Sequence, residues 1–170
     1  MQGDRPLVVH PPKGPIASLL EGPTPAVVGR PLQAPARLAG VRVLVVEDDD
    51  DSRDLICALL QMAGATVLCT GSVAEAMIGV YHSFDPDVVL TDFSMPEADG
   101  LDLIREFRKA PSSRAVAVPI LVLSGHSEVH WRERALEAGA ADLLTKPFDP
   151  AVLIARLADA VALGRSGAAA

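Results

Sequence analysis

Short apolar runs alternate with longer segments of helical periodicity from residue 42 onwards. Each run is three to five residues long and rich in Val, Ile or Leu, which is typical of a strand buried on both faces of a parallel sheet. The pattern predicts five such strands, at Arg42–Val46, Thr66–Cys69, Val88–Leu90, Ile120–Ser124 and Asp142–Thr145.

The segments between these runs carry apolar residues at helical spacing and local signals for helix ends. Ser72 followed by Glu75 forms a capping box, Gly64 stands where a C-cap glycine is expected, and Asp149 before Pro150 is an N-cap followed by a first helical residue. The predicted helices are Ser52–Ala63, a helix opening at Ser72, Leu101–Lys109, Glu128–Ala138 and Pro150–Leu163. The alternation predicts an α/β fold with a doubly wound, five-stranded parallel sheet covered on both faces.

The first 40 residues differ from the rest because they contain eight of the fourteen prolines and no sustained periodicity. Prolines at this density remove backbone donors and favour extended conformers. We therefore expect a disordered leader or linker at 1–40, a folded domain at 41–164 and a disordered tail at 165–170. A proline-rich docking ligand or a tether is the alternative for the leader.

The charge balance narrows the function. The net charge is −7, and residues after 40 hold 11 Lys/Arg against 20 Asp/Glu, a balance of −9. An acidic domain without a basic stripe is a poor candidate for direct nucleic-acid binding. The sequence shows no secretory signal and no run of about 18 uncharged apolar residues, so we expect a cytoplasmic protein without membrane attachment.

The two cysteines, Cys57 and Cys69, lie in apolar segments without metal-ligand spacing. This context favours buried free thiols. Free thiols are consistent with a reducing compartment.

Polar residues stand where four of the predicted strands end: Glu47 and Asp48, Asp92, Ser124 and Lys146. The carboxyl ends of parallel strands meet at one edge of the sheet, where ligands bind. Converging carboxylates repel each other unless a cation neutralises them, and Mg²⁺ prefers such oxygen ligands. With a lysine and a hydroxyl nearby, this set would orient a phosphoryl group for transfer to Asp92.

Each of these residues also has a simpler interpretation. Glu47 and Asp48 open an acidic run that continues to Asp51, and such runs are usually solvated. Lys146 is compatible with a surface lysine before a turn, and Ser124 with a hydroxyl that merely ends a strand. Their joint occurrence at the ends of four strands favours the functional interpretation.

Four motifs in order and spacing, VLVVEDD, VLTDFSMPEADG, LVLSG and AGAADLLTKPF, carry a resemblance to a known family. The chain from Arg42 to Leu163 resembles the receiver domain of two-component response regulators, of the single-domain kind. The resemblance implies a flavodoxin-like fold, a histidine kinase or phosphotransfer protein as phosphodonor, and Mg²⁺ as cofactor. It also implies no enzymatic activity beyond the domain's own phosphorylation and dephosphorylation.

The resemblance further assigns a role to each site residue. Asp92 would accept the phosphoryl group, and Asp48, Asp92 and the backbone carbonyl of Ser94 would bind Mg²⁺, with Glu47 acting through water. Ser124 would be the switch hydroxyl that moves to the phosphoryl group, and Lys146 would pair with that group. The Lys146-Pro147 bond stands where the family usually has a cis peptide.

Two departures from the family pattern concern signalling. Leu143 stands where the family commonly has Tyr or Phe, so signalling by rotation of a ring against Ser124 is not expected. Ser94 and His126 occupy the two positions that flank the phosphoryl group. We hypothesise that His126 shields that group and slows its loss, against the alternative of a solvent-facing histidine.

The output is expected to be protein docking. No enzymatic or DNA-binding segment follows the last helix, so we expect phosphorylation-dependent docking of a partner near the last two helices, onward relay, or a phosphorylation-dependent dimer. Trp131 is either a partner anchor or a residue packed on its own domain. Two other functions compete: a non-phosphorylated interaction module, and a haloacid-dehalogenase-type phosphohydrolase, which would need an aspartate where Ser94 stands.

Overall fold

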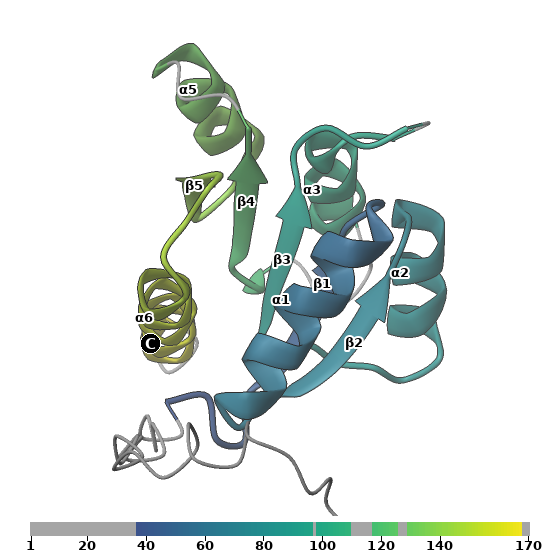
Figure 1. Ribbon diagram of the computed structural model, residues 1–170. Helices are drawn as coiled ribbons and strands as arrows, with labels where there is room; N and C mark the ends of the chain where they lie inside the picture. Colours follow the sequence, from purple (N-terminus) through teal and green to yellow (C-terminus); the bar gives the residue numbers. More distant parts are fainter. Residues whose placement is uncertain (1–36, 97, 110–116, 126–128, 168–170) are drawn as a thin grey trace, which may run out of the picture. The chain divides into compact units, whose positions relative to one another are not determined.

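The computed structural model describes residues 37–96, 98–109, 117–125 and 129–167, and within them strands and helices alternate as expected (Figure 1). The order is β1 (Arg42–Val46), α1 (Asp50–Met62), β2 (Thr66–Thr70), α2 (Val73–Tyr81), β3 (Val88–Asp92), α3 (Gly100–Lys109), β4 (Ile120–Ser124), α5 (Val129–Ala138), β5 (Asp142–Thr145) and α6 (Pro150–Gly167).

All five strands are parallel and follow the order β2-β1-β3-β4-β5. The order reverses between β1 and β3, so the loops after these strands diverge and leave a crevice at the carboxyl edge. The register places Asp92 beside Leu123, next to the end of β4. The predicted doubly wound, flavodoxin-like sheet is confirmed.

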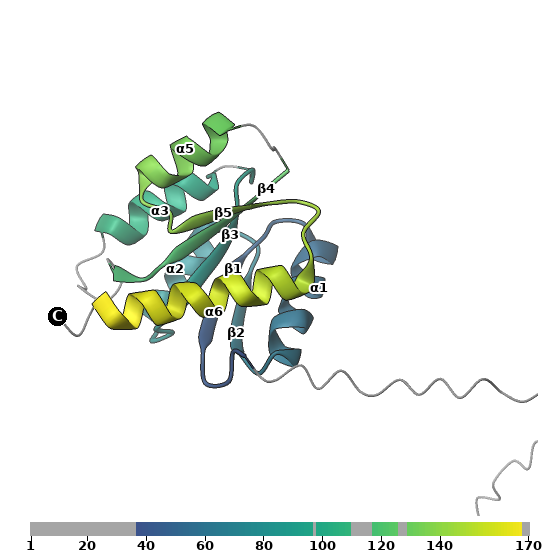
Figure 2. The same ribbon diagram turned by 90° about the vertical axis from the view of Figure 1, so that its left-hand side faces the viewer.

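Helices cover both faces of the sheet (Figure 2). Because side chains alternate along a strand, Val43 and Val45 pack with α1 and α6, whereas Leu44 and Val46 pack with α2, α3 and α5. Residues of β3 and β4 are buried throughout, as expected for central strands. Two apolar layers therefore fix the sheet from either side.

Local caps define the helix starts that border the candidate site. Asp49 caps α1 by accepting a hydrogen bond from the Ser52 amide at 2.8 Å, so α1 begins at Asp50, two residues before the predicted start. Asp149 accepts from the Ala151 amide at 2.7 Å, which confirms the predicted start of α6. The predicted cap at Ser72 is confirmed too, with the Glu75 amide at 3.2 Å.

The folded unit extends beyond the expected boundaries. Leu38 has no exposed surface, belongs to the core beside α1 and α6, and donates its amide to the Ala63 carbonyl at 3.1 Å. At the other end α6 continues to Gly167, past the expected boundary at 164. The remainder of the predicted leader and tail, residues 1–36 and 168–170, lies outside the described residues. Among the described helices, none combines the length and apolarity needed to cross a membrane.

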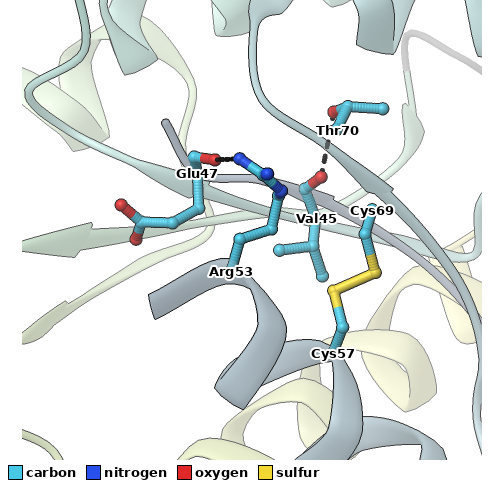
Figure 3. Close-up of a disulfide and its surroundings, with 6 residues drawn as sticks. All are labelled: Val45, Glu47, Arg53, Cys57, Cys69 and Thr70. Atoms are coloured by element: carbon cyan, nitrogen blue, oxygen red, sulfur yellow. Dashed lines mark hydrogen bonds between the residues drawn. A yellow bond between two sulfur atoms is a disulfide. The ribbon is translucent and has the colours of Figure 1, made fainter. Parts of the chain in front are cut away.

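The prediction of free thiols is wrong, because Cys57 and Cys69 form a disulfide (Figure 3). Cys57 lies on the inner face of α1 and Cys69 on β2, and both side chains belong to the same apolar layer. Packing α1 over the sheet brings their Cα atoms to 6.5 Å, within the range that a disulfide spans. The pairing depends on this docking and not on a recognisable spacing in the sequence.

Candidate functional site

The acidic residues predicted to meet do so at the carboxyl edge of the sheet. Asp92 is the last residue of β3, and Glu47 follows β1 directly. Glu47 is 2% exposed and Asp92 7%, whereas Asp48 is exposed. Carboxylate oxygens of all three lie within 4.8 Å of one another. The acidic run that begins at Glu47 is thus solvated from Asp48 onwards, but Glu47 turns into the protein.

Lys146 reaches the same point from the loop after β5. Its Nζ lies 2.6 Å from Oδ1 of Asp92 and 2.7 Å from Oε2 of Glu47. The Lys146 amide donates to the Ser124 carbonyl at 2.7 Å, which ties the loop to β4. The Lys146-Pro147 peptide is cis, as predicted. The structure therefore makes Lys146 part of the site and excludes an ordinary surface lysine.

Burial and ion pairing compete in setting the charges here. Burial raises the pKa of Glu47 above its ordinary value, in spite of the hydrogen bond from Lys146 that lowers it. For Lys146, burial lowers the pKa, but the hydrogen bonds to Asp92 and Glu47 outweigh it and the pKa is raised. The ammonium therefore stays charged through the neutral range and balances part of the acidic charge.

The other oxygen of Asp92 also has a donor. Oδ2 accepts a hydrogen bond from the Ser94 amide at 2.8 Å, so both carboxylate oxygens are oriented. Ser94 itself is exposed, and Ser124 is fully buried at the end of the neighbouring strand. Ser124 thus ends β4, as predicted. His126 lies outside the described residues, so its predicted shielding role stays a hypothesis.

The donor set suits a hard divalent cation. Three carboxylates and one ammonium leave a formal charge of −2, from 3 negative and 1 positive groups. Every ligand atom offered is an oxygen, which Mg²⁺ and related ions prefer. The exposed Asp48 provides the solvent-facing side, where such an ion retains waters. The residues present therefore fit a magnesium ion.

Two supporting contacts were not predicted from the sequence. Arg53 of α1 donates Nη1 to the Glu47 carbonyl at 2.9 Å (Figure 3), and Gly100 donates its amide to the Phe93 carbonyl at 3.1 Å. A Cβ atom at Gly100 would lie 2.5 Å from the Asp92 carbonyl oxygen. The DG dipeptide at Asp99 was a usable signal for Gly100, but nothing in the sequence marks Arg53 for this role.

Leu143 and Trp131, the two residues considered in relation to signalling, both pack on the domain. Leu143 is 8% exposed and belongs to the apolar layer on the α5 side, so this position serves as core. Trp131 packs edge-to-face on Phe93, and the guanidinium of Arg134 lies 4.8 Å from the centroid of the indole ring. Of the two roles considered for Trp131, the structure supports packing on its own domain.

Sequence relatives match more than two thirds of the chain. An uncharacterized 14.6 kDa protein of Leptolyngbya boryana is 37% identical over 117 residues, covering 69% of this chain and 87% of that protein. The transcriptional regulatory protein FixJ of Azorhizobium caulinodans is 36% identical over 124 residues, covering 73% of this chain and 56% of FixJ. The phosphate regulon regulator PhoB of Pseudomonas aeruginosa is 33% identical over 120 residues, covering 71% of this chain and 51% of PhoB. The chain thus spans about half the length of these transcriptional regulators.

Solved structures also match more than two thirds of the chain. A response regulator receiver domain protein from Clostridium thermocellum superimposes with a TM-score of 0.65 at 28% identity, covering 74% of this chain and 97% of that one. The chemotaxis response regulator CheY4 of Vibrio cholerae gives 0.63 at 28% identity, covering 71% and 98%. The model of the response regulator receiver domain family matches residues 43–158. With the acidic edge and its lysine in place, the chain belongs to the response regulator receiver domain family.

Proposed function

We propose that this protein accepts a phosphoryl group on Asp92 from the phosphohistidine of a histidine kinase or phosphotransfer protein. The observation that carries the proposal is Nζ of Lys146, placed 2.6 Å from Asp92 and 2.7 Å from Glu47 in an acidic site at the sheet edge. A buried carboxylate beside a fixed cation is suited to accept a phosphoryl group, because the negative charge that arrives is already balanced.

In the transfer, a carboxylate oxygen of Asp92 attacks phosphorus, the nitrogen–phosphorus bond of the donor breaks, and its electron pair returns to the imidazole. The ammonium of Lys146 stabilises the charge on the phosphoryl oxygens, and the hydroxyl of Ser124 donates to one of them. Held by Asp48, Asp92 and the Ser94 carbonyl, with Glu47 acting through water, Mg²⁺ would supply electrostatic neutralisation of the phosphoryl group.

The product is an acyl phosphate on the domain itself, so the protein acts as a switch and not as an enzyme on a separate substrate. Phosphorylation would change which partner docks near α5 and α6, pass the group onward, or promote a dimer. We place the protein in the cytoplasm, where kinases of this kind present their phosphohistidine.

The proposal is tested by intact mass after incubation with acetyl phosphate and Mg²⁺. We expect one phosphoryl adduct, lost in Asp92→Asn and with EDTA, and retained in Asp51→Asn, a matched change at an exposed position on α1. A stable adduct in Asp92→Asn would contradict the acceptor assignment. The same holds if neither acetyl phosphate nor a phosphohistidine protein labels the folded chain. Multiple turnover with release of phosphate from a small-molecule ester would instead favour the phosphohydrolase.

A further inference from the structure

The disulfide between Cys57 and Cys69 crosslinks α1 to β2, the edge strand next to β1. These are the two cysteines of the whole chain, so neither has another thiol of the same molecule to pair with. Cys57 is 7% exposed, and Cys69 is partly buried on the open edge of the sheet. The bond therefore involves the edge strand of the sheet, and Cys69 is the more exposed of its two cysteines.

A residue close in sequence to each cysteine forms a hydrogen bond with the main chain of Glu47. From Cys69, the next residue along β2 is Thr70, whose carbonyl accepts the Glu47 amide at 3.1 Å. One turn before Cys57 on α1 is Arg53, whose Nη1 donates to the Glu47 carbonyl at 2.9 Å. Glu47 is thus held through its amide by β2 and through its carbonyl by α1, and the disulfide joins these two elements (Figure 3).

The side chains on this path are themselves anchored. Thr70 is buried and donates its hydroxyl to the Val45 carbonyl at 3.0 Å, and Arg53 also pairs with Asp50. Direct hydrogen bonds therefore connect both α1 and β2 to Glu47. Glu47 in turn contributes one of the three carboxylates of the acidic site and one of the two partners of Lys146.

We propose that the Cys57–Cys69 disulfide is a redox control on this acidic site, with the oxidised form binding divalent cation more tightly and accepting the phosphoryl group faster. The inference rests on the proposed function, including the cytoplasmic location. It also rests on the rule that disulfides in cytoplasmic proteins of mesophiles are usually transient or redox-sensing. In the reduced form α1 and β2 are no longer crosslinked, so the two hydrogen bonds that hold Glu47 fluctuate more.

The reductant is a protein or small-molecule dithiol. Its thiolate attacks a sulfur of the pair and forms a mixed disulfide, which its second thiol resolves. Two electrons and two protons pass to Cys57 and Cys69, which become thiols, and the dithiol becomes a disulfide. The reverse exchange with an oxidised dithiol restores the bond.

The test compares the full chain in oxidised and dithiothreitol-reduced form, with Cys57→Ala/Cys69→Ala as the variant locked without the bond. Three quantities are measured: hydrogen exchange of the Glu47 amide without metal, the Kd for Mg²⁺, and the initial rate of labelling by acetyl phosphate. We expect reduction to speed the exchange about 5-fold or more. The Kd should rise about 3- to 10-fold, less than the about 10- to 100-fold typical of losing an outer-shell partner outright. The double variant should give the same three values as the reduced form, and dithiothreitol should not change them.

A control separates this coupling from general loss of stability. Val161→Ala removes two methyl groups from the core in α6, an element that the crosslink does not join, at a cost of about 2 kcal/mol. It should leave the Glu47 exchange and the Kd for Mg²⁺ unchanged. Equal changes in Val161→Ala and in the reduced protein would overturn the inference.

The remaining outcomes keep the two proposals apart. Normal labelling with the same Kd and exchange in both redox states overturns the redox control and leaves the proposed function standing. Absence of labelling in both states, by acetyl phosphate and by a phosphohistidine protein, with a Kd that still depends on redox state, refutes the acceptor role and retains the coupling of the bond to the acidic site. A chain that keeps two free thiols after equilibration with an oxidised dithiol overturns the redox control.

Discussion

The indole ring of Trp131 packs against the ring of Phe93, with centroids 4.9 Å apart and planes inclined by 72°. Phe93 directly follows Asp92, and its amide donates to the Leu123 carbonyl at 2.7 Å. An edge-to-face aromatic pair therefore connects the residue after the proposed phosphoacceptor with α5. The position where the family commonly has Tyr or Phe is a buried leucine here, Leu143. The Phe93–Trp131 pair nevertheless supplies an aromatic contact between the site and the surface helix α5.

Because Trp131 is the single tryptophan of the chain, its fluorescence reports on this contact. Adding beryllofluoride with Mg²⁺, which mimics an acyl phosphate, should change the emission intensity, since a shift of the loop after Asp92 alters the packing of Phe93. The change should be absent in Asp92→Asn and reduced in Phe93→Leu. An identical response in Asp92→Asn would show that the signal does not originate at the site.

Replacements of Lys146 should show how much its charge and its shape each contribute to the labelling rate. In Lys146→Ala the phosphoryl group would lose its fixed cation, so labelling by acetyl phosphate should fall about 10²-fold, as for loss of one preorganised donor. Lys146→Arg keeps the charge but not the compact geometry and should recover only part of the rate. Lys109→Ala, at an exposed ion pair with Glu106, is the matched control and should label normally. Labelling of Lys146→Ala at the normal rate would remove this residue from the mechanism.

Stability should depend on pH through Glu47. Burial raises its pKa in the folded state, so between the ordinary value of 4.5 and the raised value the folded chain binds more protons than the unfolded chain. The free energy of unfolding therefore falls as pH rises through this window. In EDTA at neutral pH, Glu47→Gln should therefore have a larger free energy of unfolding than the unsubstituted chain. This gap, the difference in free energy of unfolding between the two chains, should narrow as pH is lowered.

Urea unfolding of both chains between pH 4 and 8 measures this gap. Glu106→Gln, a charge removal at an exposed position, serves as the control and should show no comparable narrowing. A gap that widens towards low pH would mean that ionised Glu47 stabilises the fold, contrary to the direction of its pKa shift.

Two glycines should respond oppositely to alanine. At Gly100 an added Cβ would lie 2.5 Å from the Asp92 carbonyl oxygen, so Gly100→Ala should cost about 1–3 kcal/mol and slow labelling by displacing the Asp92 backbone. At Gly164, within α6, the added Cβ would be in ordinary contact with Pro119 at 3.4 Å. Gly164→Ala should stabilise the chain by about 0.5–1 kcal/mol and leave labelling unchanged. Thermal unfolding and the initial labelling rate check both.

The folded unit should depend on Leu38, which precedes the expected domain boundary. Because its side chain is fully buried beside α1 and α6, Leu38→Ala should lower the free energy of unfolding by about 2–4 kcal/mol. Leu55→Ala, at a side chain that is 72% exposed, should change it by less than about 0.5 kcal/mol. Equal effects in a urea titration would place Leu38 outside the cooperative unit.

The alternation of apolar runs and periodic segments determined most of the architecture, because hydrophobic periodicity and caps such as Asp149 act locally. It also predicted Glu47, Asp48, Asp92, Ser124 and Lys146 as one group, since parallel strands bring their carboxyl ends to one edge whatever their separation in sequence. The structure confirms this meeting for the carboxylates and the lysine.

Tertiary packing decided what depends on distances between elements. Whether Cys57 and Cys69 pair is set by the docking of α1 over β2, and no spacing rule anticipates it. The clamp of Arg53 on Glu47, the packing of Trp131 and the inclusion of Leu38 are contacts between elements or beyond an expected boundary. Sequence patterns report how one element buries its own apolar face, whereas these contacts depend on the relative placement of two.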